Sequence, residues 1–283
     1  MDDSFVLCFL YNTVFGRIIL KLLVQPKVSE FVGCFLSSGV SKWIIPYFIR
    51  KNKIDMSDIE IPKEGFSSFN EFFSRKRKEE CYNLSDNDMI SPCDGFLTIK
   101  KINEDTVFKI KNTRFSIKDL LKDNRFAKKY KGGMALIFRL TPANYHRYCY
   151  ISDGRILYYK KIHGILHCVR PVALRNVPVF VQNSREYQVI KTKKFDTIIQ
   201  MEIGALLVGK IKNYKHPLET KCIRRGEEKG YFEFGGSTII VLLKKDGIRF
   251  NKKLFEKRNG SGEIPVRMGD VIAKCHDEIN TIS

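Results

Sequence analysis

Short runs of β-branched and aromatic residues follow one another beyond residue 83, and turn dipeptides separate them. The runs cover residues 96–99, 134–140, 156–160, 179–181, 197–203, 206–211, 231–234 and 238–243. Asp94-Gly95, Asp153-Gly154, Gly235-Gly236 and Asp246-Gly247 favour tight turns because Gly and Asp tolerate positive φ. Such runs predict a mainly antiparallel sandwich or barrel, interrupted by one helix over residues 117–130.

Residues 4–53 show a different pattern, in which apolar residues recur at helical spacing. Ile18 and Leu22 fall on one face, with Arg17 and Lys21 on the other. This segment is therefore expected to form amphipathic helices.

Two prolines, Pro26 and Pro46, predict breaks between these helices. The fold class that follows is α+β, with N-terminal amphipathic helices before a β sandwich or barrel. We expect residues 1–75 to form a helical, membrane-associating segment and residues 76–283 to form a β-rich catalytic domain.

The helical segment has two open interpretations. Its apolar stretches over residues 5–15, 18–24 and 43–49 each fall short of the roughly 20 residues that a spanning helix needs. No spanning helix and no cleaved signal peptide are expected. Trp43 with flanking Lys42 and Arg50 suits the interface of a membrane, but the helices could equally pack on the main domain.

Charge points to an anionic partner. The formal net charge is +19, of which residues 81–283 carry +17. Such a surface attracts an anionic membrane or nucleic acid, and composition alone does not choose between them. The eight cysteines are scattered without a CxxC pair, which indicates reduced thiols in a cytoplasmic setting.

Taken singly, the candidate functional motifs also have ordinary structural explanations. Ser91-Pro92-Cys93-Asp94-Gly95 is typical of a β-turn, and Phe234-Gly235-Gly236-Ser237-Thr238 of a hairpin. His163 and His167 have the spacing of a helical zinc pair, but Gly164 between them argues against a helix, so no metal site is expected.

The order of the motifs carries more information than any one of them. The motifs are Tyr11-Asn12-Thr13 with Gly16-Arg17, Phe69-Asn70-Glu71-Phe72-Phe73 with Arg75, Ser91 to Gly95, Tyr145-His146-Arg147, Met201-Glu202-Ile203-Gly204-Ala205, Gly209-Lys210-Ile211 and Phe234 to Thr238. In this order they resemble the phosphatidylserine decarboxylase family across nearly the whole chain.

The resemblance implies a proenzyme that cuts itself between Gly236 and Ser237, giving chains 1–236 and 237–283. Ser237 Oγ would attack the Gly236 carbonyl, which two glycines allow to approach closely. Asp94 and a histidine would activate the hydroxyl, as in a serine-protease triad. Elimination would then convert Ser237 into an N-terminal pyruvoyl group.

That pyruvate-derived cofactor would form a Schiff base with the amine of phosphatidylserine and accept the electrons released with CO₂. A general acid must then protonate Cα before phosphatidylethanolamine leaves, and we expect His146 in this role. The site residues implied are thus Asp94, His146, His167 and Ser237, with the cut at Gly236.

His167 is included among the site residues because the chain departs from the family pattern at Cys149, where many members have a second histidine. That histidine is often assigned to the triad. We expect His167 to supply the missing imidazole, with the alternative that His146 performs both tasks.

The expected partners are the phosphatidylserine substrate, an anionic membrane surface on the cytoplasmic side, to which the protein binds peripherally, and the second cleaved chain. A homodimer remains open. Three rivals stay open too: a decarboxylase of another serine phospholipid such as an archaeal ether lipid, a basic nucleic-acid-binding β protein, and a thiol hydrolase using Cys149 or Cys168. The decarboxylase interpretation involves no nucleic acid.

Overall fold

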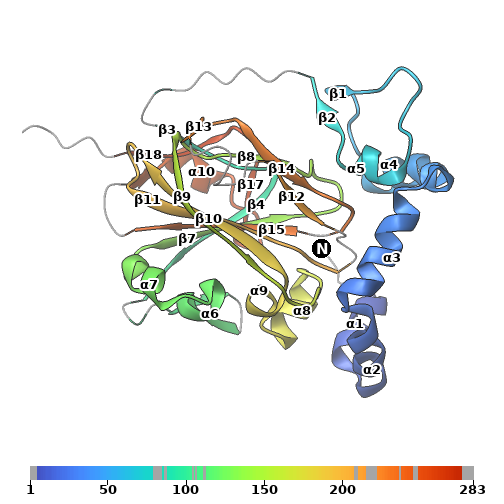
Figure 1. Ribbon diagram of the computed structural model, residues 1–283, viewed down its shortest axis with the longest axis horizontal. Coiled ribbons are helices and arrows are strands. Elements are labelled where there is room, and N and C mark those ends of the chain that lie inside the picture. The colour runs from blue at the N-terminus through green and yellow to red at the C-terminus, as the bar shows by residue number, and fades with distance from the viewer. Residues whose placement is uncertain are drawn as a thin grey trace, which may run out of the picture.

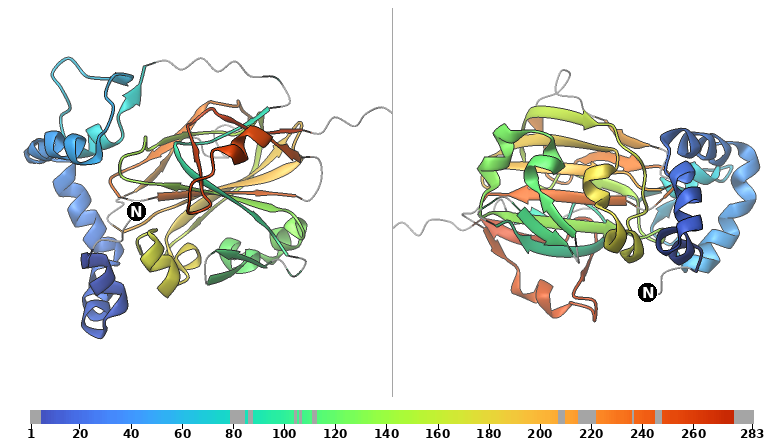
Figure 2. Two further views of the ribbon diagram at one scale, coloured as in Figure 1. Left: turned by 180° about the vertical axis from the view of Figure 1, so that it is seen from behind. Right: turned by 90° about the horizontal axis from the view of Figure 1, so that it is seen from below.

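The computed structural model describes residues 5–78, 85, 88–103, 105, 107–110, 113–206, 210–214, 222–235, 237–244 and 248–275. An arm of N-terminal helices stands beside a body of antiparallel sheets (Figure 1). Both further views show the arm at one side of the body (Figure 2). The expected α+β class is confirmed.

The arm is built from short helices. They are α1 (Phe5–Asn12), α2 (Val14–Leu23), α3 (Pro26–Leu36), the 3-10 helix η1 (Gly39–Trp43), α4 (Ile44–Asn52) and α5 (Phe69–Phe73). Thr13 separates the first two, because its Oγ1 accepts the Gly16 N–H at 2.9 Å and caps α2. Pro26 begins α3 as predicted. Pro46 does not mark a break, because it lies in the first turn of α4, where no intrahelical N–H bond is lost.

No single described helix is long and apolar enough to cross a membrane. Two bent pairs pass the length and composition test together: α1 with α2, at 100°, and α3 with residues 39–52, at 77°.

The body centres on an eight-stranded antiparallel sheet of order β13-β9-β10-β11-β15-β7-β4-β17. Its strands are β13 (Cys222–Ile223), β9 (Gly154–Ile162), β10 (Arg185–Thr192), β11 (Thr197–Ile203), β15 (Ser237–Leu243), β7 (Met134–Leu140), β4 (Gly95–Lys101) and β17 (Ile264–Val266). Every residue of β15 is buried, so this strand lies at the centre of the core.

Smaller sheets and helices complete the body. The sheets are β12 (Ile211–Asn213), β14 (Glu228–Phe232) and β8 (Arg147–Cys149); β16 (Ile248–Phe250), β18 (Val271–Cys275) and β3 (Asp88–Ile90); β5 (Val107–Ile110) with β6 (Thr113–Ser116); and β1 (Ile59–Glu60) with β2 (Lys76–Arg77). The helices are α6 (Ile117–Leu121), α7 (Asn124–Ala127), η2 (Lys128–Tyr130), α8 (Pro171–Asn176), α9 (Val179–Gln182) and α10 (Lys252–Glu256).

A fully buried ion pair joins the large sheet to the sheet of β12, β14 and β8. Lys229 Nζ on β14 donates to Glu202 Oε2 on β11, and also to Asn213 Oδ1 at 2.9 Å. Burial raises the pKa of Glu202 and lowers that of Lys229, while the pairing opposes both shifts. The layer between these two sheets is therefore partly polar.

A second apolar cluster joins the arm to the body. Its buried members are Leu36, Phe69, Phe72 and Phe73. Phe234, which follows β14, packs against them, with its ring centroid 5.1 Å from that of Phe73. The arm is thus fixed to the chain segment that leads to Ser237.

Several expected elements differ from the structure. Residues 179–181 form helix α9 and not a strand, because the turn starts at Pro178, whose carbonyl accepts the Val181 and Gln182 N–H groups. The single helix expected over 117–130 is broken after α6, where Lys122 adopts a left-handed φ of 46° and Asp123 caps α7. The run expected over 206–211 falls partly outside the described residues, since positions 207–209 are not described.

Candidate active site

Ser237 is the first residue of β15, and the strand register fixes the direction of its side chain. Ile239, two residues on, lies opposite Glu202 of β11. Side chains alternate along a strand, so Ser237 shares the face of Ile239 and Glu202. Glu202 binds Lys229 of β14, so this face looks toward the sheet of β12, β14 and β8. Ser237 Oγ is fully buried there and makes no hydrogen bond with the described residues.

His146 directly precedes β8 and is also fully buried. Its Nδ1 lies 2.8 Å from the Asn144 carbonyl oxygen, which only accepts, so the proton is on Nδ1. Nε2 therefore carries the lone pair, and it has no hydrogen-bond partner among the described residues. Burial, with a smaller effect of the Arg75 charge, lowers the pKa of His146 to about 3. The imidazole is thus neutral at physiological pH, with an unshared lone pair on Nε2.

The imidazole lies beside the segment that leads to Ser237. Its ring centroid is 4.0 Å from that of Phe73, which also contacts Phe234. The His146 carbonyl accepts the Phe232 N–H at 3.0 Å. Tyr148, two residues after His146, has its ring centroid 5.8 Å from Lys229 Nζ, which binds Glu202, so alternation along β8 directs the His146 side chain toward the layer that Ser237 also faces. No described hydrogen bond joins His146 to Ser237. Gly236, the other side of the expected cut, lies outside the described residues.

Asp94 occupies the turn before β4, as the sequence predicts. Its carboxylate accepts two hydrogen bonds from the Arg77 guanidinium, at 3.1 and 2.6 Å, and the Met268 N–H at 2.9 Å. The next residue, Gly95, has a φ of 149°, and a Cβ there would meet the Arg139 carbonyl oxygen at 2.6 Å. Glycine thus allows β4 to start in contact with β7. Among the described residues, the side chain that binds Asp94 is that of an arginine and not of a histidine.

His167 lies at the junction of arm and body. Its Nδ1 is 3.1 Å from Tyr11 Oη on α1, and its backbone N–H donates to Asn183 Oδ1 at 2.9 Å. It lines a pocket of about 300 Å³ that also contains Arg17 and Lys21 of α2. No described contact joins His167 to Asp94 or Ser237, so its proposed catalytic role stays a prediction.

Cys149, where the resemblance led us to expect a second histidine, is buried on β8. Its Sγ donates weakly to the Ser91 carbonyl oxygen at 3.8 Å, and its own carbonyl accepts Gln200 Nε2 at 2.9 Å. Cys168 lies elsewhere, with its N–H donating to Tyr11 Oη at 3.0 Å. Cys149 therefore lies in the core, in contact with Ser91 at the start of the turn that contains Asp94.

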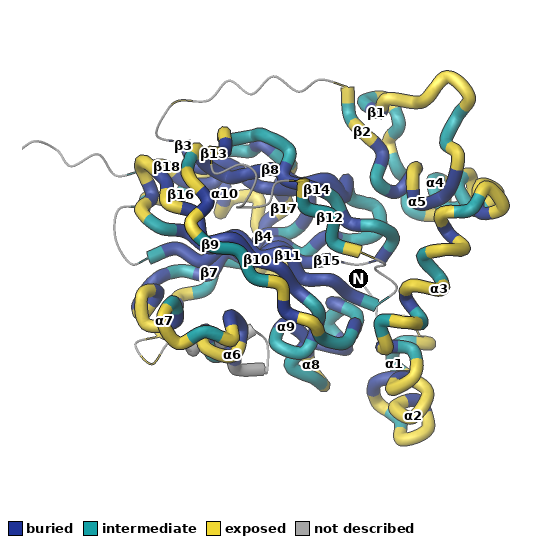
Figure 3. The backbone as a smooth tube through the Cα atoms, viewed as in Figure 1, coloured by how far each residue is buried: buried dark blue, intermediate teal, exposed yellow. Residues whose placement is uncertain are grey.

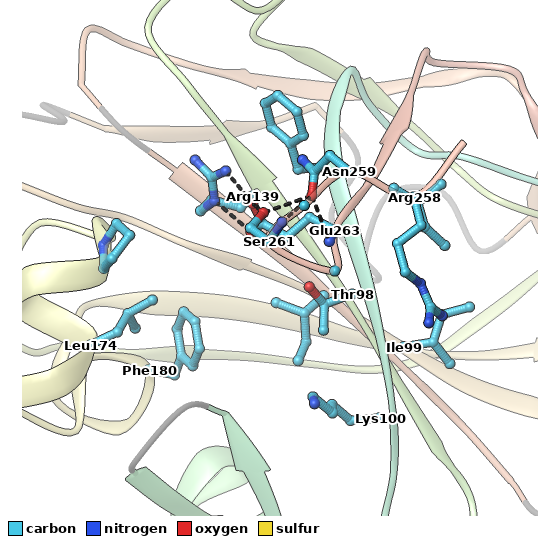
Figure 4. A pocket seen from close by; sticks show the side chains of 16 residues that line it. Thr98, Ile99, Lys100, Arg139, Leu174, Phe180, Arg258, Asn259, Ser261 and Glu263 are labelled. Atoms are coloured by element: carbon cyan, nitrogen blue, oxygen red, sulfur yellow. Dashed lines mark hydrogen bonds and ion pairs between the residues drawn. The ribbon is translucent and has the colours of Figure 1, made fainter. Parts of the chain in front are cut away.

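A pocket of about 800 Å³ lies on the opposite face of the large sheet (Figure 4). Its walls are Phe96, Thr98 and Arg139 from β4 and β7, helices α8 and α9, and the loop of residues 258–263. Figure 4 shows Arg139, Ser261 and Glu263 gathered at one end, where Arg139 pairs with Glu263 at 2.7 Å. Thr238 lies opposite Arg139 in the register, so its side chain, and not that of Ser237, shares this face. None of the four candidate residues lines this pocket.

Sequence reasoning gave no role to the residues around His146 that come from α5 and its C-terminal side. Asn70 Oδ1 accepts the Phe234 N–H at 3.2 Å, and the buried Arg75 lies near enough to His146 to lower its pKa. The sequence does show Arg75 directly after the aromatic run of residues 69–73. The spacing of these residues does not show, however, that the run packs beside Phe234.

Comparison with known proteins shows which family the chain belongs to. The family model described as phosphatidylserine decarboxylase matches residues 69–274. The phosphatidylserine decarboxylase proenzyme 2 of Clostridium acetobutylicum is 41% identical over 273 residues, covering 95% of this chain and 91% of the relative. The phosphatidylserine decarboxylase proenzymes of Ruminiclostridium cellulolyticum and Fusobacterium nucleatum are 38% and 37% identical, over 95% and 93% of this chain and 91% and 88% of the relatives. The match runs through the Asp94 turn, His146 and the Ser237 strand, and the chain belongs to the phosphatidylserine decarboxylase family.

Proposed function

We propose that this protein converts phosphatidylserine to phosphatidylethanolamine and CO₂, using a pyruvoyl group made from Ser237 by self-cleavage after Gly236. The names of its relatives give both the substrate and the proenzyme character. The observation that carries the proposal is the buried Ser237 Oγ, without a hydrogen-bond partner among the described residues, in the same layer as the neutral His146. Buried hydroxyls are normally hydrogen-bonded, and of the two unpartnered hydroxyls at the start of β15 only that of Ser237 faces the layer of His146, since Thr238 lies on the other face.

Self-cleavage would begin with attack of Ser237 Oγ on the Gly236 carbonyl, and the hydroxyl proton must go to a base. His146 Nε2 is the candidate in the same layer that is neutral and unpartnered. The amide becomes an ester as the acyl group moves from N to O. Loss of the Ser237 Cα proton then breaks the Cβ–O bond, which leaves the Gly236 carboxylate and a dehydroalanine. Water converts the latter into a pyruvoyl group and ammonia.

The residues around Ser237 fit such a group. Ser237 lies at the start of a buried strand that is hydrogen-bonded on both sides, so the new terminus is held in place. A pyruvoyl carbonyl supplies an acceptor for the electrons that CO₂ leaves behind. In this proposal the His146 imidazole would take up a proton during the reaction and pass it to the lipid Cα.

The test is the mass of the purified protein. We expect two chains, of residues 1–236 and 237–283, with the 47-residue fragment resistant to Edman sequencing because it has no terminal amine. A single intact chain that decarboxylates phosphatidylserine would contradict the proposed mechanism. The same assay should be run with ester-linked and with ether-linked serine phospholipids. The relative rates show whether the substrate is phosphatidylserine or the archaeal ether lipid.

The proposal includes peripheral attachment to the cytoplasmic side of a membrane. Most of the large exposed hydrophobic residues belong to the arm: Phe5, Val6, Phe9, Val14, Phe15, Ile18, Ile19, Leu22, Phe31, Phe35, Val40, Trp43 and Tyr47. The arm is accordingly coloured largely as exposed (Figure 3). An apolar surface of this extent, next to Arg17 and Lys21, suits insertion among anionic lipids.

Replacing Phe15, Ile18 and Leu22 together by serine is expected to lower binding to phosphatidylserine-containing vesicles at least about tenfold, because each buried side chain contributes about 1.5–3 kcal/mol. These side chains on α2 are 57–75% exposed, so self-cleavage should continue. Co-sedimentation with vesicles measures the effect. Leu157→Ser on β9, where the side chain is 55% exposed, is the matched control. Equal binding of both variants would remove the support for attachment through the arm.

A further inference from the structure

Arg75 is a buried cation without an acidic partner among the described residues. It lies between α5 and β2 and is 4% exposed. Its Nη1 donates to the Phe72 carbonyl oxygen at 3.5 Å, and its guanidinium lies 5.1 Å from the centre of the Phe72 ring. Among the described residues, its Nε–H has no acceptor, and no carboxylate lies within ion-pair distance. A guanidinium rarely stays buried in this state unless something else binds it.

A second buried arginine shows what a structural role looks like. Arg185 is 1% exposed, and its guanidinium donates to the carbonyl oxygens of Leu120, Val181, Asn183 and Asp119 at 2.7–3.0 Å. Such bonds satisfy the donors of a buried guanidinium with fixed backbone acceptors. Arg75 makes one such bond to a backbone carbonyl oxygen, and it is long, at 3.5 Å. Most of the N–H groups of its guanidinium can therefore bind a ligand.

The charges near Arg75 do not neutralise it. Arg77 is paired with Asp94 and Asp58, Arg147 is paired with Glu228, and His146 is neutral. Burial and the Arg77 charge lower the pKa of Arg75 to about 10, which leaves it protonated at neutral pH. The neighbouring carboxylates are thus already bound by Arg77 and Arg147, which leaves the Arg75 charge without an ion-pair partner among the described residues.

Arg75 also lies beside the active site and at the base of the arm. Phe73, two residues earlier, contacts both the His146 imidazole and the Phe234 ring. Figure 1 shows α5 and β2 next to α4, where the arm meets the body. Arg75 therefore lies close both to the arm and to the chain segment that leads to Ser237.

We infer that Arg75 binds the phosphodiester of the phospholipid substrate, an inference that rests on the proposed function. A planar guanidinium fork matches two phosphate oxygens. The serine carboxylate is the poorer partner, because it becomes neutral CO₂, and a cation bound to it would stabilise the substrate more than the transition state. The phosphodiester keeps its charge throughout the reaction, so binding it anchors the headgroup without opposing the chemistry.

The experiment uses the mature enzyme with phosphatidylserine in mixed micelles, and compares Arg75→Gln and Arg75→Lys with wild type. For Arg75→Gln we expect normal self-cleavage, and about 10- to 100-fold increases in KM and in the inhibition constant of glycerophosphoethanolamine, with a smaller change in kcat. Inhibition by ethanolamine, which lacks the phosphate, should not change. Arg75→Lys, which keeps the charge but not the fork, should lie between. Arg125→Gln removes the same charge from an exposed position on α7 and should keep KM within about twofold.

Several results would overturn the assignment. Arg75→Gln enzyme that matures with unchanged KM and unchanged glycerophosphoethanolamine inhibition would show that the guanidinium does not bind phosphate. An Arg75 effect seen with glycerophosphoserine but not with glycerophosphoethanolamine would identify the carboxylate as the partner instead. If Arg75→Gln stays uncut while Arg75→Lys matures with wild-type KM, or if both stay uncut, the residue serves folding or maturation. Wild-type enzyme that does not decarboxylate phosphatidylserine would refute the proposed function itself.

Discussion

Ser237→Ala is expected to remain a single chain of 283 residues with no measurable decarboxylase activity. Removal of Oγ takes away the atom that attacks the Gly236 carbonyl, so neither the cut nor the pyruvoyl group can form. Folding should be unaffected, because Oγ makes no hydrogen bond with the described residues and its loss leaves no polar partner unsatisfied. Intact-mass measurement and a CO₂-release assay on the same preparation provide both readouts.

The neighbouring hydroxyl offers a matched control. Thr238 Oγ1 is equally buried and also unpartnered among the described residues, but it lies on the opposite face of β15. Thr238→Val should therefore still produce the 47-residue fragment. If Thr238→Val blocks the cut as fully as Ser237→Ala, the defect reflects packing of this strand and not the loss of a nucleophile.

His146→Ala is expected to slow self-cleavage by about a hundred- to ten-thousand-fold, the usual contribution of general base catalysis. The structure places its neutral, unpartnered Nε2 in the layer of Ser237, while His167 contacts Tyr11 of the arm. His167→Ala should thus mature, and serves as the matched control. The time course of fragment formation after synthesis measures both variants.

The pH dependence follows from the pKa of about 3 for His146. The imidazole stays neutral as the pH falls through 6.5, so the rate of self-cleavage should not fall there through titration of this group. The stability of the fold should fall, because below pH 6.5 the unfolded chain binds a proton on His146 that the folded chain does not bind until about pH 3.

The histidine variants also have an outcome that would contradict the role given to His146. If His167→Ala and Asp94→Ala stay uncut while His146→Ala is cut, the pairing of His167 with Asp94 expected from the sequence is correct.

Local patterns predicted the strands whose apolar residues are continuous. Residues 134–140 and 197–203 form β7 and β11 with the expected bounds. Strand β10 was missed because Arg185, Glu186 and Gln188 give it the composition of a surface segment. All three side chains are buried, and Arg185 and Glu186 are hydrogen-bonded to α6 and to Asn213 in the layer around Lys229, which no local pattern can reveal.

The site was predictable where chemistry is encoded by neighbours in sequence. Two glycines before Ser237, and Asp94 in a turn, are visible in the chain itself. The Arg77 partner of Asp94 and the packing of Phe73 on His146 join residues distant in sequence, so the fold alone brings them together. The His167 prediction relied on its position after a turn, and position along the chain does not fix where a side chain points.

The central place of β15 has a consequence for the lifetime of the enzyme. After the proposed cut, this strand would still lie between β11 and β7, and strands β17 and β18 of the same fragment would still pair with β4 and β3 of the longer one. The shorter fragment could dissociate only if β15 lost its pairing with both β11 and β7. The two fragments should therefore remain together without a covalent link. Once heat separates them, however, reassembly becomes a bimolecular event between two partial cores that are prone to aggregate. The lifetime of the cleaved protein would thus depend on its rate of unfolding and not on the equilibrium between folded and unfolded states, because the uncut chain that folded originally would no longer be present.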